Sequence, residues 1–381
     1  MKVSGDWLTA NATQAVFRAL QAQGNAAFAV GGCVRNALMH VPVTDVDIAT
    51  DATPEQVQSL AEAASLKPVP TGIDHGTITV VSAGTGYEVT TFRADTETDG
   101  RHAIVRFSTD MTEDAARRDF TMNALYADAD GTVIDPLNGL PDLLARRVRF
   151  IGNPQDRIAE DYLRILRFFR FAAWYGDPDH GFDADALGAI ANSLDGLSGL
   201  SCERIGGEVI KLLSASNPAP AVGSMAQTGV LYAVLPGSDP RALAPLVHLE
   251  NSLLCLPDPL RRLASIGVFD GTSLRLSKKD QRRLAQYQSL IPSSESAKEL
   301  GYRHGAEIGR DVLLLRSAML EAPFDPGAIE LVDIGAEAKF PVKPGDLMPT
   351  YTGAALGEKL RELEDRWIAS GFALTKSDLL G

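Results

Sequence analysis

The segment 27–50, AFAVGGCVRNALMHVPVTDVDIAT, carries the residues best suited to chemistry. Asp45 and Asp47 are two positions apart, so in a strand both carboxylates point to one face. Carboxylates this close repel each other unless a cation lies between them, and magnesium takes such oxygen ligands. Upstream, Gly31-Gly32 allows close backbone approach to a phosphate, and Arg35 offers a charged fork to it. A lone Asp-x-Asp is often a surface loop, so the prediction of a magnesium and phosphate site depends on the joined pattern.

Three further motifs follow this segment along the chain. They are RRDFTMNAL at Arg117–Leu125, DPLNGLPDL at Asp135–Leu143 and IGNPQDRIAEDYLRILRFFRFAA at Ile151–Ala173. Together with GGxVR and DxD, in this order and spacing, the chain resembles the DNA polymerase β-like nucleotidyltransferases. Within them it is similar to the class II tRNA nucleotidyltransferases (CCA-adding enzymes) and the bacterial poly(A) polymerases. The resemblance covers roughly the first half of the chain, and the second half matches more loosely.

The resemblance implies a reaction, its substrates and a cofactor. CMP and AMP are transferred from CTP and ATP to the 3′ end of tRNA, pyrophosphate is released, and Mg²⁺ is the cofactor. One alternative is a poly(A) polymerase on the same scaffold, which tends to be basic and has a Gly-Arg-Arg-Phe-like stretch after the last sheet strand. This chain is acidic and has Gly100-Arg101-His102 and Arg106-Phe107 instead. The other alternative is a non-catalytic RNA- or nucleotide-binding module, against which the intact motif residues argue.

The resemblance also assigns roles to individual residues. Asp45 and Asp47 are expected to hold the metal, and Glu88, on a later strand, is the candidate third catalytic carboxylate. A purely structural pairing of Glu88 with Arg93 at the sheet rim is the alternative. We expect the nucleotide to be bound by Gly32, Arg35, Arg118, Asp119, Asn123, Asp161, Arg164, Arg167 and Arg170.

A strong helix is predicted over residues 158–174, and it carries a row of charges at three-residue spacing. Asp161 and Arg164 are expected to touch one group, the base, whereas Arg167 is adjacent and Arg170 reaches phosphate or RNA. Aspartate accepts and arginine donates, so the pair matches the amine and ring nitrogen that cytosine and adenine share on their pairing edges. A helix with i, i+3 salt bridges is the ordinary alternative.

A second predicted helix, 113–127, places Asp119 and Asn123 on one face because they are four residues apart. In the family this motif handles the ribose and phosphates, and a role in bracing the sheet is the alternative. Asn36 stands where the family pattern GGxVRD usually has aspartate. We expect that change to alter a contact around the site and to leave the activity intact.

The elements that position these residues predict an α+β protein, with a small mixed-sheet nucleotidyltransferase head followed by an all-helical neck, body and tail. The expected domains are 1–148 for the head, 149–215 for the base-reading neck, and 216–381 for the tRNA-binding body and tail. Caps, hydropathy and turn residues predict helices at 5–23, 33–39 and 54–64, strands at 28–30, 45–49, 76–82 and 87–92, and a mobile loop at 94–112. Later helices are expected at 184–193, 202–215, 218–228, 241–254, 278–290, 305–320 and 356–370.

The amino-acid composition limits the classes of protein to which the chain can belong. A net charge of −13 over 381 residues argues against a general nucleic-acid coat protein, but it allows an enzyme with a local basic groove. Nothing reaches the length of a membrane-spanning helix, and three widely spaced cysteines favour a reducing cytoplasm. No protein partner can be inferred. Candidate basic patches are Arg146, Arg147 and Arg149; Arg261 and Arg262; and Lys278, Lys279, Arg282 and Arg283.

Overall fold

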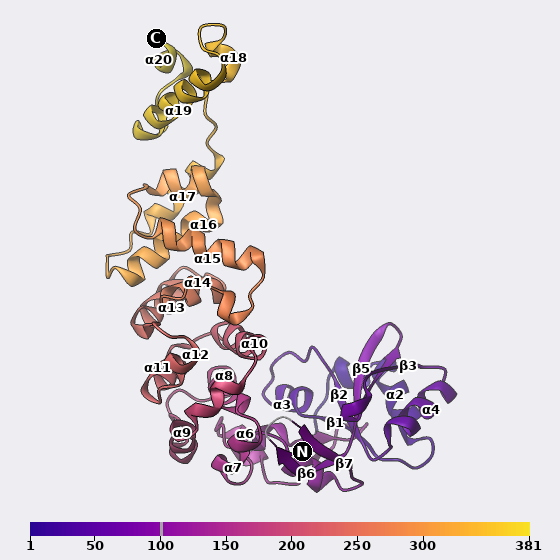
Figure 1. Ribbon diagram of the computed structural model, residues 1–381. Helices are drawn as coiled ribbons and strands as arrows, with labels where there is room; N and C mark the ends of the chain where they lie inside the picture. The colour runs from indigo at the N-terminus through magenta and orange to yellow at the C-terminus, as the bar shows by residue number, and fades with distance from the viewer. Residues whose placement is uncertain (100–101) are drawn as a thin grey trace. The chain divides into compact units, whose positions relative to one another are not determined.

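The chain forms two compact units in this computed structural model, which describes residues 1–99 and 102–381 (Figure 1). The first unit is Met1–Pro236 and contains the sheet, and the second is Gly237–Gly381 and is helical. The α+β class is therefore confirmed. The finer division at residues 148 and 215 stays a prediction.

A seven-stranded mixed sheet forms the core of the first unit, in the order β3-β4-β5-β2-β1-β8-β9. Strands β2 and β5 are parallel, and the other neighbours are antiparallel. Its strands are β1 (Ala27–Val30), β2 (Asp47–Thr50), β3 (Lys67–Gly72), β4 (Thr77–Ser82), β5 (Thr85–Thr91), β8 (Tyr126–Ala127) and β9 (Val133–Ile134). The sequence pattern does not indicate β3, because Pro68 and Pro70 interrupt it. As an edge strand, β3 can tolerate both prolines.

Helices lie against this sheet close to the predicted places. The single helix predicted over 5–23 is two helices, α1 (Asp6–Thr9) and α2 (Asn11–Gln21), because Ala10 between them is extended. Helix α3 (Gly32–Leu38) follows β1, and α4 (Pro54–Ala63) follows β2. The start of α4 is as predicted, with a capping box in which Thr53 and Gln56 each accept from the other's backbone N–H.

The loop predicted over 94–112 is wrong for most of its length. Strands β6 (Arg93–Asp99) and β7 (His102–Phe107) pair as an antiparallel ribbon, and α5 (Met111–Ala116) begins the next element. Residues 95–101 are polar, and the short apolar run at 103–105 does not alternate, so the hydropathy pattern does not predict the ribbon. Gly100 and Arg101 lie outside the described residues.

The helix predicted over 113–127 is also wrong beyond its first turns. Helix α5 ends at Ala116, and a 3₁₀ turn, η2 (Thr121–Asn123), precedes β8. Phe120 is extended between them, with a backbone bridge to Phe150 and its N–H bonded to the Asp119 side chain. A side chain that captures the next backbone N–H competes with helical bonding, and here that competition ends the helix.

The helix predicted over 158–174 is interrupted. It consists of α7 (Pro154–Glu160) and α8 (Leu163–Tyr175), separated by Asp161, which has φ −155° and ψ 105°. The Asp161 carboxylate accepts the N–H of Leu163, the first residue of α8, at 3.1 Å, so its extended backbone ends α7 while its side chain binds the start of α8. Asp161 and the three arginines therefore do not form one helical row.

Helix α8 is buried through a cluster of aromatic rings. The rings of Phe150 and Phe168 stack at 5.6 Å, and that of Phe171 lies 4.8 Å from Phe120. These contacts fix α8 beside the turns that follow α5. The unit is completed by α6 (Leu140–Leu144), α9 (Ala184–Ala191), α10 (Cys202–Leu213), α11 (Ala219–Gln227) and α12 (Val230–Val234).

The second unit is all-helical, as predicted. Its helices are α13 (Leu243–Ser252), α14 (Pro259–Ser265), α15 (Lys278–Leu290), α16 (Ala297–Met319), α17 (Gly327–Glu337), α18 (Pro344–Leu347), α19 (Gly353–Ala369) and α20 (Lys376–Leu380). Helix α16 begins before its predicted start and is kinked at Gly305, whose φ of 84° suits glycine. None of the described helices is both long and apolar enough to cross a membrane.

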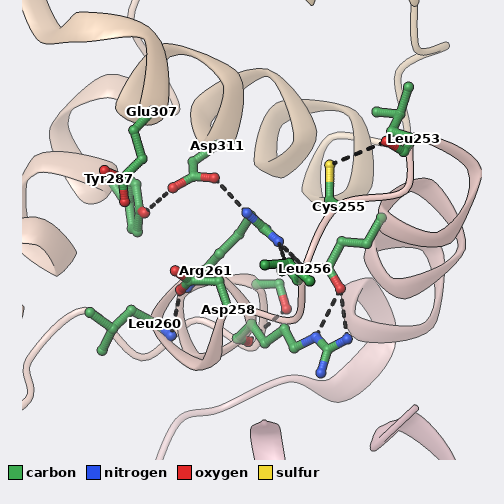
Figure 2. Close-up of polar contacts among 12 residues, drawn as sticks. Leu253, Cys255, Leu256, Asp258, Leu260, Arg261, Tyr287, Glu307 and Asp311 are labelled. Atoms are coloured by element: carbon green, nitrogen blue, oxygen red, sulfur yellow. Dashed lines mark hydrogen bonds and ion pairs between the residues drawn. The ribbon is translucent and has the colours of Figure 1, made fainter. Parts of the chain in front are cut away.

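Arg261 and Arg262 do not form the basic surface patch that the sequence suggested. They are 6% and 1% exposed, and both donate to Glu250, which is fully buried. Asp311 lies between Arg261 and Tyr287 (Figure 2). Its carboxylate accepts from Arg261 Nη1 at 2.6 Å and from the Tyr287 hydroxyl at 2.5 Å. The arginines are thus part of an internal ion network between α13, α14, α15 and α16.

Candidate active site

Two of the three predicted carboxylates, Asp47 and Glu88, lie opposite each other in the sheet, and Asp45 lies in the loop before it. Strand β2 begins at Asp47, not at Asp45 as predicted, and its parallel register places Asp47 opposite Glu88 on β5. Asp45 lies two residues before β2 in an exposed loop. Burial, and then the nearby charges of Glu88 and Asp45, raise the pKa of Asp47, although Arg118 acts in the opposite direction. Negative charge is therefore concentrated at this end of β2.

This donor set is suited to a hard cation. Its groups are carboxylate oxygens, which magnesium prefers. Desolvation is the main cause of the raised pKa of Asp47, and the smaller contribution from repulsion by Glu88 and Asp45 would be relieved by a bound cation. Within residues 1–99 and 102–381, no three acidic, histidine or cysteine side chains are gathered as a ready-made metal site.

Arg118 is held rigidly at the same site. Its Nη2 donates to Asp114 at 2.8 Å and its Nε to the Tyr126 hydroxyl at 3.2 Å, and that hydroxyl donates to Asp114 at 2.8 Å. Burial alone would lower the pKa of Arg118, but Asp114 reverses the effect and the net pKa is raised. Asp114 and Tyr126 were not identified from the sequence, although an acid four residues before Arg118 was a usable signal.

The two glycines form the turn between β1 and α3. Gly31 has φ +69°, which favours glycine, and a methyl group on it would lie 3.6 Å from Arg118 Nη1. Gly32 is the first residue of α3. The backbone therefore passes close to a fixed cation here, as the sequence suggested for a phosphate site.

Arg35 is largely internal, whereas the sequence suggested a fork presented to phosphate. It is 6% exposed, and its guanidinium donates to the side chains of Asn36, Asn123 and Tyr175. Asn36 also donates from Nδ2 to the Pro42 carbonyl at 3.1 Å. An aspartate at position 36 would lack that N–H, so the departure from the family pattern supports a contact specific to this chain.

Asp119, Asn123 and Arg167 are in contact, although not through a helix. Asn123 donates to Asp119 Oδ1 at 2.9 Å across η2, and Arg167 Nε donates to Oδ2 at 2.8 Å. Burial opposes ionisation of Asp119, but Arg167 and Asn123 outweigh it and lower its pKa. The Asp119 carboxylate is thus ionised at neutral pH, and both of its oxygens accept hydrogen bonds from neighbouring side chains.

Asp161 and Arg164 face the same cavity, but each has another partner. Asp161 Oδ2 accepts from Arg204 at 2.7 Å, and Arg164 donates to Glu160 at 2.5 Å and to the carbonyl of Arg117 at 3.1 Å. The two side chains are therefore held in place by separate neighbours. Glu160 and Arg204 could not be identified from the sequence, because the helix break after α7 determines which side chains reach Arg164 and Asp161.

One cavity of about 700 Å³ brings these residues together. It is lined by Gly31, Gly32, Arg35, Asp45, Asp47, Arg93, Arg117, Arg118, Asp119, Asn123, Asp161, Arg164, Arg167, Arg170, Phe171 and Lys211. Glu88 is not among these described lining residues. Basic side chains outnumber acidic ones in this lining, and Asp45 and Asp47 are two of its four acidic residues. Such a surface suits a metal-bound polyphosphate.

Comparison with known proteins places this geometry in a class. Residues 27–149 match the Poly A polymerase head domain, and residues 182–241 match the Probable RNA and SrmB-binding site of polymerase A. The sheet, the cavity and these matches define a nucleotidyltransferase.

Relatives that match most of the chain narrow the class of nucleotidyltransferase further. The chain is 35% identical to the mitochondrial CCA tRNA nucleotidyltransferase 1 of Mus musculus, over 92% of this chain and 84% of the mouse protein. It is 36% identical to a CCA-adding enzyme of Limosilactobacillus reuteri, over 74% and 71%. The crystal structure of the Bacillus stearothermophilus CCA-adding enzyme in complex with CTP superposes with a TM-score of 0.74 at 28% identity, covering 94% and 92%. The chain belongs to the family of CCA-adding tRNA nucleotidyltransferases.

Proposed function

We infer that this protein adds CMP and AMP, from CTP and ATP, to the 3′ end of tRNA and releases pyrophosphate. The observation that carries the inference is the single cavity that joins Asp45 and Asp47 to Arg118 and the arginines of α8. The names of the relatives support tRNA over poly(A) as the product, because they match most of this chain and are CCA-adding enzymes.

Asp45 and Asp47 are proposed to hold Mg²⁺, with Glu88 beside them as the third carboxylate. When bound, the metal would lower the pKa of the attacking 3′ hydroxyl and neutralise charge on the leaving pyrophosphate. Glu88 lies opposite Asp47 in the β2–β5 register and outside the cavity lining, so it acts through its charge on Asp47.

The triphosphate is proposed to lie along the glycine turn. Arg118 is fixed by Asp114 and Tyr126, so its guanidinium needs little ordering when a phosphate binds. Gly32 allows the backbone to approach. Arg35 and Asn123 support this side of the cavity from within, while Arg170, whose Nε donates to Glu208 at 2.5 Å, lies farther along α8.

The base is proposed to be read by Asp161 and Arg164, with Arg167 and Asp119 next to them. Asp161 retains acceptor capacity after binding Arg204, and Arg164 retains donors after binding Glu160. Cytosine and adenine present an amine beside a ring acceptor, and uracil and guanine reverse that pattern. A wrong base leaves polar groups unpaired, at a cost of roughly 1–3 kcal/mol each.

The second unit and the end of the first are proposed to bind the tRNA, and the exposed cations of α15 are the best candidates for phosphate contacts. Lys279 and Arg282 line a second cavity, of about 310 Å³, on that helix. A cytoplasmic location is proposed from the scattered cysteines.

The test is product length on a defined substrate. With tRNA that lacks its terminal triplet, plus CTP, ATP and magnesium, gel analysis should show addition that stops after three nucleotides. Asp47→Asn should abolish addition, because it removes a charged ligand without changing shape, while Asp130→Asn, at an exposed turn, should not. Long adenosine tails on unstructured RNA, made as readily as the tRNA product, would overturn the proposal in favour of a poly(A) polymerase.

A further inference from the structure

Five side chains, here named the Arg35 ring, are linked in a row by hydrogen bonds, and four of them line the cavity. Arg35 donates from Nη1 to Asn123 and from Nη2 to the Tyr175 hydroxyl at 2.9 Å. Asn123 donates to Asp119 at 2.9 Å, and Asp119 accepts from Arg167 Nε at 2.8 Å. Arg167 and Tyr175 both belong to α8, so the helix itself closes the ring.

Cation–π contacts with two aromatic side chains of α8 reinforce the Arg35 ring. Arg167, Phe171 and Tyr175 follow one another at four-residue spacing, so they share one face of α8. The Arg35 guanidinium carbon lies 4.0 Å from the centre of the Tyr175 ring and 5.1 Å from that of Phe171, both within cation–π range. Because Arg35 is almost completely buried, water competes little with these contacts.

The ring joins the two halves of the proposed nucleotide site. On one side, Asn36 accepts from Arg35 and donates to the carbonyl of Pro42, in the loop that leads to Asp45. On the other side, α8 carries Arg164 in its first turn, next to the base-reading position. The ring therefore fixes the distance between the metal-binding loop and the helix that reads the base.

We propose that Tyr175 is a positioning residue for nucleotide selection, which acts through Arg35 and Phe171 to hold α8 in register with the metal-binding loop. The inference rests on the proposed function. A correct nucleotide must satisfy its base contacts and its triphosphate contacts at once, and a displacement of about 1 Å can lower a rate about 10²-fold. CTP and ATP gain from base contacts that UTP and GTP lack. Loosening the ring therefore reduces the use of CTP and ATP more than that of UTP and GTP.

The test measures kcat/KM for CTP and for UTP on tRNA lacking its terminal triplet. Tyr175→Leu removes both the hydroxyl and the aromatic face, and it should lower the CTP-over-UTP ratio about tenfold. Tyr175→Phe keeps the face and removes the acceptor of Arg35, and it should lower the ratio about threefold. Tyr232→Leu is the matched control, because it makes the same change at a half-exposed tyrosine of α12 that is not among the residues lining the cavity. Its ratio should equal that of the wild type.

The outcomes separate positioning from simple bracing. If Tyr175→Phe retains the wild-type ratio, or if Tyr175→Leu loses activity equally with both nucleotides while its unfolding temperature falls, the proposal is overturned. Should the leucine variant fail to fold, the ratio for the phenylalanine variant decides. A wild-type protein that does not complete the triplet would refute the proposed function, and this result is distinct from a change in ratio between variants.

Discussion

Replacing Glu250 with glutamine is expected to destabilise the second unit by about 3–5 kcal/mol. The Glu250 carboxylate is fully buried and accepts from Nε and Nη2 of Arg261, at 2.8 and 2.7 Å, and from the same atoms of Arg262, at 2.9 and 2.8 Å. Glutamine keeps the shape, but it removes the charge and turns an N–H toward a guanidinium. Arg261 keeps Asp311 at 2.6 Å, whereas the 1% exposed Arg262 loses this carboxylate. Loss of the carboxylate charge from a fully buried ion network is the physical origin of the large effect.

The assay is hydrogen–deuterium exchange of the full chain, followed on peptides from α13 and α14. Because each 1.4 kcal/mol is a factor of ten, protection there should fall by about two to three and a half powers of ten. Peptides from β1 and β2, in the first unit, give an internal reference. A matched control is Asp333→Asn, which breaks a half-exposed pair with Arg310 and should change stability by at most about 1 kcal/mol. If α13 amides of the Glu250 variant exchange within about threefold of the wild type, the network does not stabilise the unit as argued.

Two further predictions concern the charges of each unit. Although burial opposes ionisation, Arg118 and Arg117 hold the pKa of Asp114 below its ordinary 3.8, so its charge stabilises the fold above that pH and the effect is lost as pH falls through the lowered pKa. Asp114→Asn should therefore lower the unfolding temperature at neutral pH and progressively less below about pH 4; an equal loss across the range would contradict this. Lys279→Glu with Arg282→Glu should weaken tRNA binding, as measured by filter binding. The slope of log binding constant against log salt concentration should become shallower by about 0.7–0.9 for each phosphate that the protein no longer neutralises. An equal weakening from Lys359→Glu with Lys376→Glu, the same charge change at lysines paired with Glu362 and Asp346, would point to general charge and not to α15.

Much of the site's composition could be predicted from the sequence because it depends on short spacings. The glycine turn, the two aspartates and the motif around Arg118 line the cavity as one group. Element starts with a local cap were also predictable, as at Thr53, and so was the whole of helix α15. Such signals act over a few residues, where the chain's own geometry determines which groups meet.

Two predicted helices were wrong because side chains end them at points where the apolar spacing continues. Apolar spacing runs through both 113–127 and 158–174, but Asp119 and Asp161 bind backbone N–H groups and redirect the chain. The ribbon β6–β7 was missed for the opposite reason, because its backbone pairing has no hydropathy signal. Periodicity reports which residues face a core, and it is a poor guide to where hydrogen bonding changes.

The sequence by itself determined the family, the α+β order of the chain and most residues of the cavity, since motif identity and local caps are properties of neighbouring positions. The tertiary structure decided which charges are available. Arg35 meets Tyr175 across 140 positions, and Arg261 meets Asp311 across 50, so both guanidinium groups are buried although the sequence suggested exposed cations. Burial of a charge is favourable only where a partner is held at the right place, and that place is set by how the helices pack.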